Sequence, residues 1–178
     1  GTVFSFIPKT GAEAVDHSFV GYPDDGALPV ASLINVAGNL YGTTTAGGSC
    51  PLGSGIACGT VFSVTPAGNE NVVYSFQGSP DGYYPAASLI NVDGTLWGTT
   101  LIGGASNQGT VFKVTPAGAE TVVYSFSGCG DNGGAWPSNL IKVKGKLYGT
   151  TPACGANQFG TVFSIDPNTG TEKVIYSF

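Results

Sequence analysis

The chain has 178 residues and a net charge of −5, with 42% hydrophobic and only 10% charged residues. This length suits one domain with a sizeable core. Six basic residues argue against the basic surface that nucleic acid or an anionic membrane requires. Twenty-nine glycines and 11 prolines predict many tight turns between short strands, and no apolar run approaches the roughly 20 residues of a transmembrane helix.

A unit of roughly fifty residues recurs along the chain, as in propellers and solenoids. An aromatic-Ser-Phe triplet ends each unit, except that His17 takes the place of the tyrosine in the first. Variants of Ser-Leu-Ile-Asn-Val and of Leu-Tyr-Gly-Thr-Thr stand between consecutive units. The motif Gly-Thr-Val-Phe begins at Gly1, Gly59, Gly109 and Gly160. This order of motifs predicts that every unit folds in the same way.

Taken in chain order, the first strands are expected at 1–8 and 13–19, and they make only the outer half of one blade. Each of the three following units is expected to form four antiparallel strands, several of them apolar on both faces, as in sheets buried on both sides. Asp93-Gly94 is a strong two-residue hairpin signal. In the middle unit the four strands are predicted at 86–92, 95–100, 109–115 and 120–126.

The predicted fold is therefore an all-β, propeller-like array of four-stranded antiparallel blades, with about three and a half repeats. One repeat domain is expected over 1–178. A closed propeller needs at least about four blades, and unpaired sheet edges promote association. We therefore expect either a piece of a longer array, with Gly1 at a processing or truncation point, or assembly with copies of the same chain as a dimer or filament. The expected division is 1–28 for the outer half-blade and its loop, and 29–76, 77–126 and 127–178 for three blades.

The motif order resembles two known kinds of repeat. The last unit, with Asp-Pro-Asn-Thr-Gly at 166–170, is similar to the repeats of quinoprotein-type propellers. The nearer resemblance is to the GloVer-type tandem repeats of bacterial secreted and surface-anchored proteins. Segments 38–44, 47–48 and 59–62 reproduce their Gly-Asn-Leu-Tyr-Gly-Thr-Thr, Gly-Gly and Gly-Thr-Val-Phe string. This resemblance covers essentially the whole chain, and it implies a secreted or cell-surface location more than an activity.

The four cysteines indicate an oxidising compartment. Cys50 and Cys58 lie in one loop of the first full unit, and Cys129 and Cys154 lie in two loops expected on the same face, so two disulfides are predicted. A zinc site is the alternative interpretation, although the spacing does not fit a paired zinc knuckle. Redox catalysis is less favoured because the sequence has no Cys-x-x-Cys.

The single histidine and the regularly spaced glutamates do not point to catalysis. Because the counterparts of His17 are tyrosines, a packing role is favoured over that of a general base. A repeated structural or surface role also fits the glutamates better than an acid–base pair in one cleft. The tyrosine counterparts are Tyr74, Tyr124 and Tyr176, and the glutamates are Glu13, Glu70, Glu120 and Glu172.

The strongest candidates for a binding site lie in two loops of each unit that are expected on one face. Rings that stack on sugars, beside polar groups that bind hydroxyls, suit glycans. The alternative is structural, with Asp-Gly forming turns and aromatic rings capping the blades. The candidates are Tyr22, Asp24, Asp25, Asp81, Tyr83, Tyr84, Asp131, Asn132 and Trp136 in the longer loops, and Asn107 and Asn157 in the shorter ones.

No metal or cofactor is predicted, with one weaker alternative. Calcium could bind to Asp24 and Asp25, or to Asp131 and Asn132, but these residues lack the regular ligand spacing of a calcium loop.

The sequence favours an extracellular, non-catalytic structural module that self-assembles. The alternative is a lectin-like, carbohydrate-binding propeller that uses the aromatic and acidic loops. A hydrolase or a quinoprotein-like oxidoreductase is least favoured, because no catalytic triad, metal cluster or cofactor-binding set is recognisable. The expected partners are copies of the chain itself, further repeats of a longer parent chain, or glycans.

Overall fold

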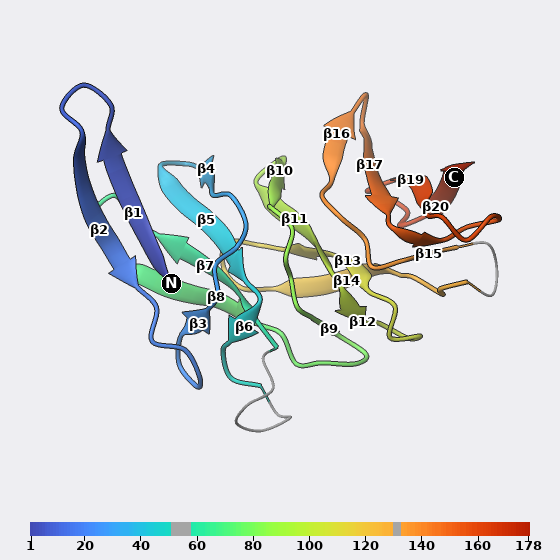
Figure 1. Ribbon diagram of the computed structural model, residues 1–178, viewed down its shortest axis with the longest axis horizontal. Coiled ribbons are helices and arrows are strands. Elements are labelled where there is room, and N and C mark those ends of the chain that lie inside the picture. Colours follow the sequence, from blue (N-terminus) through green and yellow to red (C-terminus); the bar gives the residue numbers. More distant parts are fainter. Residues whose placement is uncertain (51–57, 130–132) are drawn as a thin grey trace.

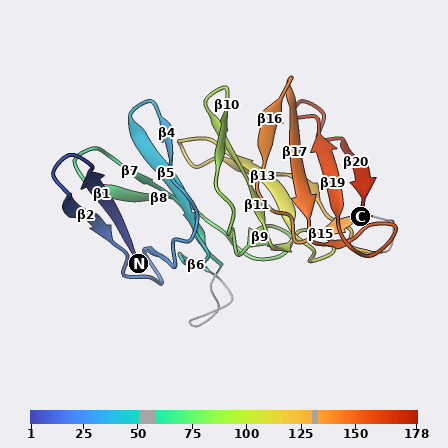
Figure 2. The same ribbon diagram turned by 45° about the horizontal axis from the view of Figure 1, so that its top comes forward.

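The computed structural model describes residues 1–50, 58–129 and 133–178. All of the regular structure in these ranges is β, in twenty strands, which confirms the predicted class. Small sheets lie side by side along the longest axis of the molecule, from the N-terminal hairpin to the C-terminal sheet (Figures 1 and 2). Within the same ranges no helix has the length and apolar character that a bilayer crossing needs.

The N-terminal sheet is a hairpin of β1 (Thr2–Ile7) and β2 (Ala12–Ser18), here called the half-blade. Three antiparallel four-stranded sheets follow it, here called blades I, II and III. Blade I contains β4 (Ile34–Val36), β5 (Asn39–Thr44), β7 (Thr60–Val64) and β8 (Glu70–Ser75). Blade II contains β10 (Ile90–Val92), β11 (Thr95–Thr100), β13 (Thr110–Val114) and β14 (Glu120–Ser125). Blade III contains β16 (Ile141–Val143), β17 (Lys146–Thr151), β19 (Thr161–Ile165) and β20 (Glu172–Ser177).

A two-stranded ribbon, which was not predicted, also recurs before each four-stranded blade. It joins the long loop before a blade to the residues that follow the Gly-Thr-Thr motif. The ribbons pair β3 (Gly26–Ala27) with β6 (Ala46–Gly47), β9 (Gly82–Tyr83) with β12 (Ile102–Gly103), and β15 (Gly134–Ala135) with β18 (Ala153–Cys154). The ribbons fix the position of the long loops, which carry most of the predicted ligand residues.

The first hairpin of each blade closes through two residues with positive φ. Asp93 and Gly94, with φ of 53° and 86°, form the predicted turn between β10 and β11. Two left-handed residues match the twist of a tight hairpin. The strand before this turn is shorter than predicted, because β10 starts at Ile90 rather than at Ala86. Ahead of β10, the Ser88 N–H donates to Asn139 Oδ1 of the next unit at 2.9 Å instead of to a neighbouring strand.

The core lies between successive blades. Phe19 packs edge to face on Phe62 with ring centroids 4.9 Å apart, and the same contact joins the next blades, Phe76 with Phe112 and Phe126 with Phe163. A Cβ on Gly98 would lie 2.6 Å from Cζ of Phe112, and the counterparts of Gly98 are equally crowded. The glycine of Leu-Tyr-Gly-Thr-Thr is therefore required by the close approach of this ring.

Both predicted disulfides are confirmed. Cys50 is bonded to Cys58 and Cys129 to Cys154, with Cα atoms 5.6 and 4.6 Å apart. Together they use all four cysteines of the chain, so the zinc alternative for the cysteines is wrong.

Candidate functional site

A polar cluster recurs where each outer strand meets the next blade, and we call it a seam cluster. It joins the aromatic or histidine residue of one outer strand, the aspartate of the following loop and the glutamate that begins the next outer strand. The first seam cluster is His17, Asp25 and Glu70, and the second is Tyr74, Asp81 and Glu120. In the third, Tyr124 donates to Glu172 Oε2 at 3.4 Å, and Gly133 stands at the aspartate position.

The second seam cluster holds the long loop of blade II in place. Asp81 Oδ2 accepts from the Tyr74 hydroxyl at 2.9 Å and from the Gln77 N–H at 2.8 Å. Burial, and then the charge of Asp81, raises the pKa of the Glu120 carboxyl to about 7. Burial and the hydrogen bond to Asp81 also raise the pKa of Tyr74. This cluster therefore has the character of a structural hydrogen-bond network.

The first seam cluster has the same arrangement, but a histidine, His17, stands where the second cluster has a tyrosine. Asp25 is only 6% exposed, and its Oδ2 accepts from the Val20 N–H at 2.7 Å and lies 3.2 Å from His17 Nε2. Burial first, and then Asp25, raises the pKa of Glu70, whereas His17 lowers it. A basic nitrogen and two carboxylates thus meet in a partly buried position. His17 was predicted to pack and Glu70 to have a repeated structural or surface role, because neither residue alone indicates the other.

The predicted ligand residues fall into different environments. Tyr22 and Asp24 are exposed, whereas Asp25 is buried and bonded within its own loop. The Tyr83 hydroxyl donates to Asn107 Oδ1 at 3.0 Å, so these two candidates do meet. Asp131 and Asn132 lie outside the described residues. Asp81 and Tyr84 are partly buried, whereas Trp136 and Asn157 are exposed.

An open groove of about 550 Å³, here called the Trp136 groove, is lined by segments that flank blade II and by residues of blade III and its loops. It contains one of the predicted residues, Trp136. The backbone of Trp136 is left-handed, with φ of 60°, and its N–H donates to the Gln108 carbonyl at 2.9 Å, so the indole is anchored by its main chain. Phe159, Phe178 and Asn139 also line the groove, and none of the three was among the predicted ligand residues. The sequence does contain a signal for Phe159, because this residue is inserted between Gln158 and Gly160, whereas Gln108 is followed directly by Gly109.

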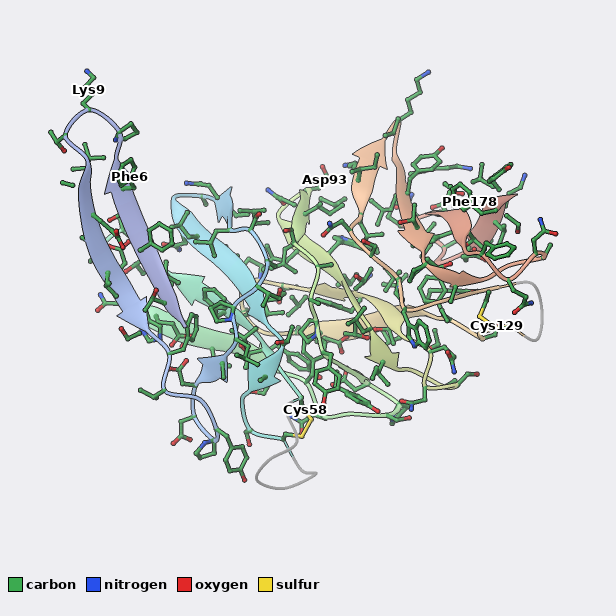
Figure 3. The ribbon with its side chains drawn as sticks, viewed as in Figure 1. Phe6, Lys9, Cys58, Asp93, Cys129 and Phe178 are labelled. Carbon is green, nitrogen blue, oxygen red and sulfur yellow. A yellow bond between two sulfur atoms is a disulfide. The ribbon has the colours of Figure 1, made fainter. Side chains whose placement is uncertain are left out.

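The two ends of the blade row expose residues that are buried inside it. Phe4 of the half-blade is 60% exposed, whereas its counterpart Phe62 is 1% exposed. Phe178 of blade III is 52% exposed, whereas its counterpart Phe126 is 1% exposed. Phe6 and Phe178 stand at opposite ends of the molecule (Figure 3). Each end therefore presents one side of an inter-blade contact.

Comparisons with known proteins bear on the fold and on the repeat. The chain is similar to a chain in the crystal structure of a nidogen/laminin complex, with 14% identity and a TM-score of 0.57, over 93% of this chain and 52% of that one. It is also similar to Bacteroides ovatus xyloglucan PUL GH43B, with 21% identity and a TM-score of 0.47, over 87% of this chain and 32% of that one. This chain thus spans about half of the first structure and about a third of the second.

The likeness to the nidogen/laminin chain concerns the fold alone, and the observed fold is the predicted propeller-like array of antiparallel four-stranded blades. None of the curated proteins matches the chain. Residues 1–178 match a family model described as the Gloeobacter/Verrucomicrobia repeat, in agreement with the resemblance drawn from the motifs.

Proposed function

Because the chain belongs to the Gloeobacter/Verrucomicrobia repeat family, we propose that it is an extracellular, non-catalytic propeller module that assembles head to tail with copies of itself. The observation that carries this proposal is the series of phenylalanine contacts between blades. Each contact pairs the phenylalanine of one outer strand with that of the next Gly-Thr-Val-Phe strand. Phe178 and Phe4 are the two members of this series that have no such partner within the described part of the chain.

A second series of contacts, between the hairpin glycine of one blade and the outer strand of the preceding blade, also lacks a partner at each end of the row. A Cβ on the hairpin glycine Gly118 would lie 2.6 Å from the Val73 carbonyl oxygen of the preceding blade, and Gly170 approaches Val123 in the same way. The corresponding glycine of the half-blade is Gly11, which has nothing within 4 Å. The corresponding strand residue of blade III is Ile175, which is exposed. A second copy placed with Gly11 over Ile175 and Phe4 on Phe178 continues both series at once.

The polar groups at the two ends are also complementary. Tyr124 of blade II reaches Glu172 of blade III, and Tyr176 and Glu13 are the corresponding groups at the two ends of the row. Both are exposed. Apolar contacts in the centre with a tyrosine–carboxylate contact at the side match the anatomy of a stable interface. The two disulfides support the extracellular part of the proposal, because such bonds persist in oxidising compartments.

Size-exclusion chromatography with light scattering over a range of chain concentrations tests the assembly. We expect dimers or longer species that Phe178→Ser dissociates and that Tyr22→Ser leaves unchanged, because Tyr22 is an exposed aromatic outside the series of phenylalanine contacts. A monomer at all concentrations, or equal association by both variants, contradicts self-assembly. The exposed end faces would then be left for further repeats of a longer parent chain.

The Trp136 groove favours a second candidate function, carbohydrate binding. Trp136 and Phe159 present exposed rings there, and Asn139 adds an amide, as in shallow sites that stack on sugar rings. Screening of the chain on a glycan array tests this function, with Trp136→Ala as the variant. The control is Phe6→Ala, an exposed ring at the other end of the molecule from Phe178 (Figure 3). Binding that Trp136→Ala abolishes and Phe6→Ala preserves supports the function, and absence of binding removes it.

A further inference from the structure

We propose that His17, Asp25 and Glu70 bind a divalent transition-metal ion, with zinc as the reference ion, at the seam between the half-blade and blade I. One ligand atom from each of the three residues lies within 4.8 Å of the other two. His17 Nε2 and Asp25 Oδ2 are already 3.2 Å apart. Ligand atoms bound to zinc at about 2.0–2.2 Å stand roughly 3.3 Å from one another. Small side-chain rotations therefore suffice to bring all three atoms to one ion.

Two of the three side chains are held in orientation by their neighbours. The Asp25 carboxylate accepts from the Val20 N–H at 2.7 Å through Oδ2 and from the Gly26 N–H at 2.6 Å through Oδ1. The His17 ring packs edge to face on Phe19, with centroids 4.7 Å apart. Outer contacts of this kind orient metal ligands and strengthen their binding.

The third side chain has a buried oxygen that a bound cation would satisfy. Glu70 Oε1 is fully buried and accepts no hydrogen bond from the residues that the structure describes. A buried carboxylate oxygen without a partner is costly. The Glu70 carboxylate also lies in a cluster with a second carboxylate, that of Asp25. A cation at this point would satisfy the free oxygen and offset the repulsion between the two carboxylates.

The second seam cluster shows which part of the arrangement is structural. There Tyr74 and Asp81 form the same contact with a hydroxyl donor, and Glu120 Oε1 is also buried without a partner in the described ranges. The contact with the aspartate and the buried glutamate oxygen are thus common to these two clusters. An imidazole nitrogen occurs only at His17, the single histidine of the chain. Replacement of tyrosine by histidine keeps the polar contact with the aspartate. Once that nitrogen is unprotonated it is a good metal ligand, and metal binding then replaces the hydrogen bond.

The donor set selects the class of ion. One imidazole nitrogen with two carboxylate oxygens suits zinc and its neighbours in the first transition row, whereas calcium prefers oxygen ligands alone. Three protein ligands leave a further position for water. Because His17 belongs to β2 and Glu70 to β8, the ion joins the half-blade to blade I. Its binding therefore stabilises the two-stranded half-blade, which contacts a blade on one side only.

The test is a titration of the intact chain with zinc chloride and with calcium chloride, followed by calorimetry and thermal unfolding. We expect one zinc ion per chain and, at a hundredfold excess over Kd, a rise in Tm of roughly 5–10 °C. Because His17 is the only histidine, its imidazole NMR signals report directly on the site, and we expect them to shift with zinc and not with calcium.

The matched variant is His17→Tyr, which installs the residue that the other repeats use at this position. We expect it to fold like the wild type and to lose zinc affinity at least about tenfold, the equivalent of one ligand or more. Glu70→Gln, which preserves the shape of the side chain, is the second variant and should lose affinity to a similar degree. Equal zinc binding by wild type and both variants, or no zinc-dependent change in Tm and imidazole signals, overturns the proposal.

Discussion

Phe76 of blade I packs edge to face on Phe112 of blade II, with ring centroids 5.0 Å apart and ring planes at 75°. Neither ring belongs to the hydrogen-bonded sheet of the other. The blades are therefore joined mainly by side-chain packing, whereas the strands within each blade are joined by the backbone. Aromatic pairs in this geometry contribute beyond the apolar area that they bury.

Loss of a phenylalanine inside the row should be far more costly than loss of its counterpart at the end. Phe112 is fully buried, so we expect Phe112→Ala to lower the free energy of unfolding by about 3–5 kcal/mol. Phe4→Ala should cost less than about 1 kcal/mol in the monomer, because Phe4 is exposed. Urea unfolding at low protein concentration measures both. Equal losses would show that blade packing is not the main source of stability.

The aspartate of the second seam cluster should be a stability determinant. Asp81→Ala leaves the Tyr74 hydroxyl and the Gln77 N–H without their acceptor, and we expect a loss of about 1–3 kcal/mol. The control is Asp24→Ala, which removes an exposed carboxylate and should change stability by less than about 0.5 kcal/mol. Thermal unfolding of the three proteins separates a structural aspartate from a surface one. A large loss in the control would contradict the assignment.

Stability should depend on pH through Glu120. Its pKa rises from the ordinary value of 4.5 to about 7 in the folded chain. Between these values the folded state binds more protons than the unfolded state, so the contribution is present below pH 4.5 and is lost as the pH rises through 7. Relative to wild type, Glu120→Gln should gain on the order of 1 kcal/mol between pH 5 and pH 8, since solvent screens part of the effect. The free energy of unfolding of wild type and of Glu120→Gln is measured against pH. Two parallel curves would refute this prediction.

The two disulfides should contribute unequally. Cys129–Cys154 closes a sequence separation of 25 residues and Cys50–Cys58 one of 8. Loop-closure entropy then gives about 3.5 kcal/mol for the first and about 2.5 kcal/mol for the second. The double variants Cys129→Ser with Cys154→Ser, and Cys50→Ser with Cys58→Ser, measure each contribution by urea unfolding under non-reducing conditions. The reverse order would mean that loop length does not govern these bonds.

Repetition made the blades and the disulfides predictable. Asp93-Gly94 and its counterparts predict their turns from two adjacent residues alone. The bonding of Cys129 to Cys154 is predicted once their two loops are expected on the same face. Local signals cannot show how blades meet. The contact of Phe76 with Phe112 joins residues from two units, and the shortening of β10 depends on Asn139 of the next blade.

The candidate site was predictable in composition but not in geometry. Trp136 was predicted as a ligand-binding residue, and its ring is exposed. Tyr83 does meet Asn107. Which carboxylate faces inward could not be predicted, because neighbouring Asp24 and Asp25 differ only in how the loop turns. The association of His17 with Glu70 depends on two strands of different units, so neither residue alone indicated the seam cluster. Ligand binding by these loops stays a prediction, as do the blade boundaries.

The half-blade contacts a neighbouring blade on one side, whereas blade I is flanked on both sides (Figure 1). In arrays of this kind, local opening is governed by the number of adjacent units. Because the half-blade also has only two strands, amide hydrogens of β1 and β2 should exchange with solvent deuterium earliest, and those of the central strands last. Anything that covers Phe4 should slow the exchange of these first amides. The order of exchange along the chain therefore reports whether the end faces of the blade row are covered.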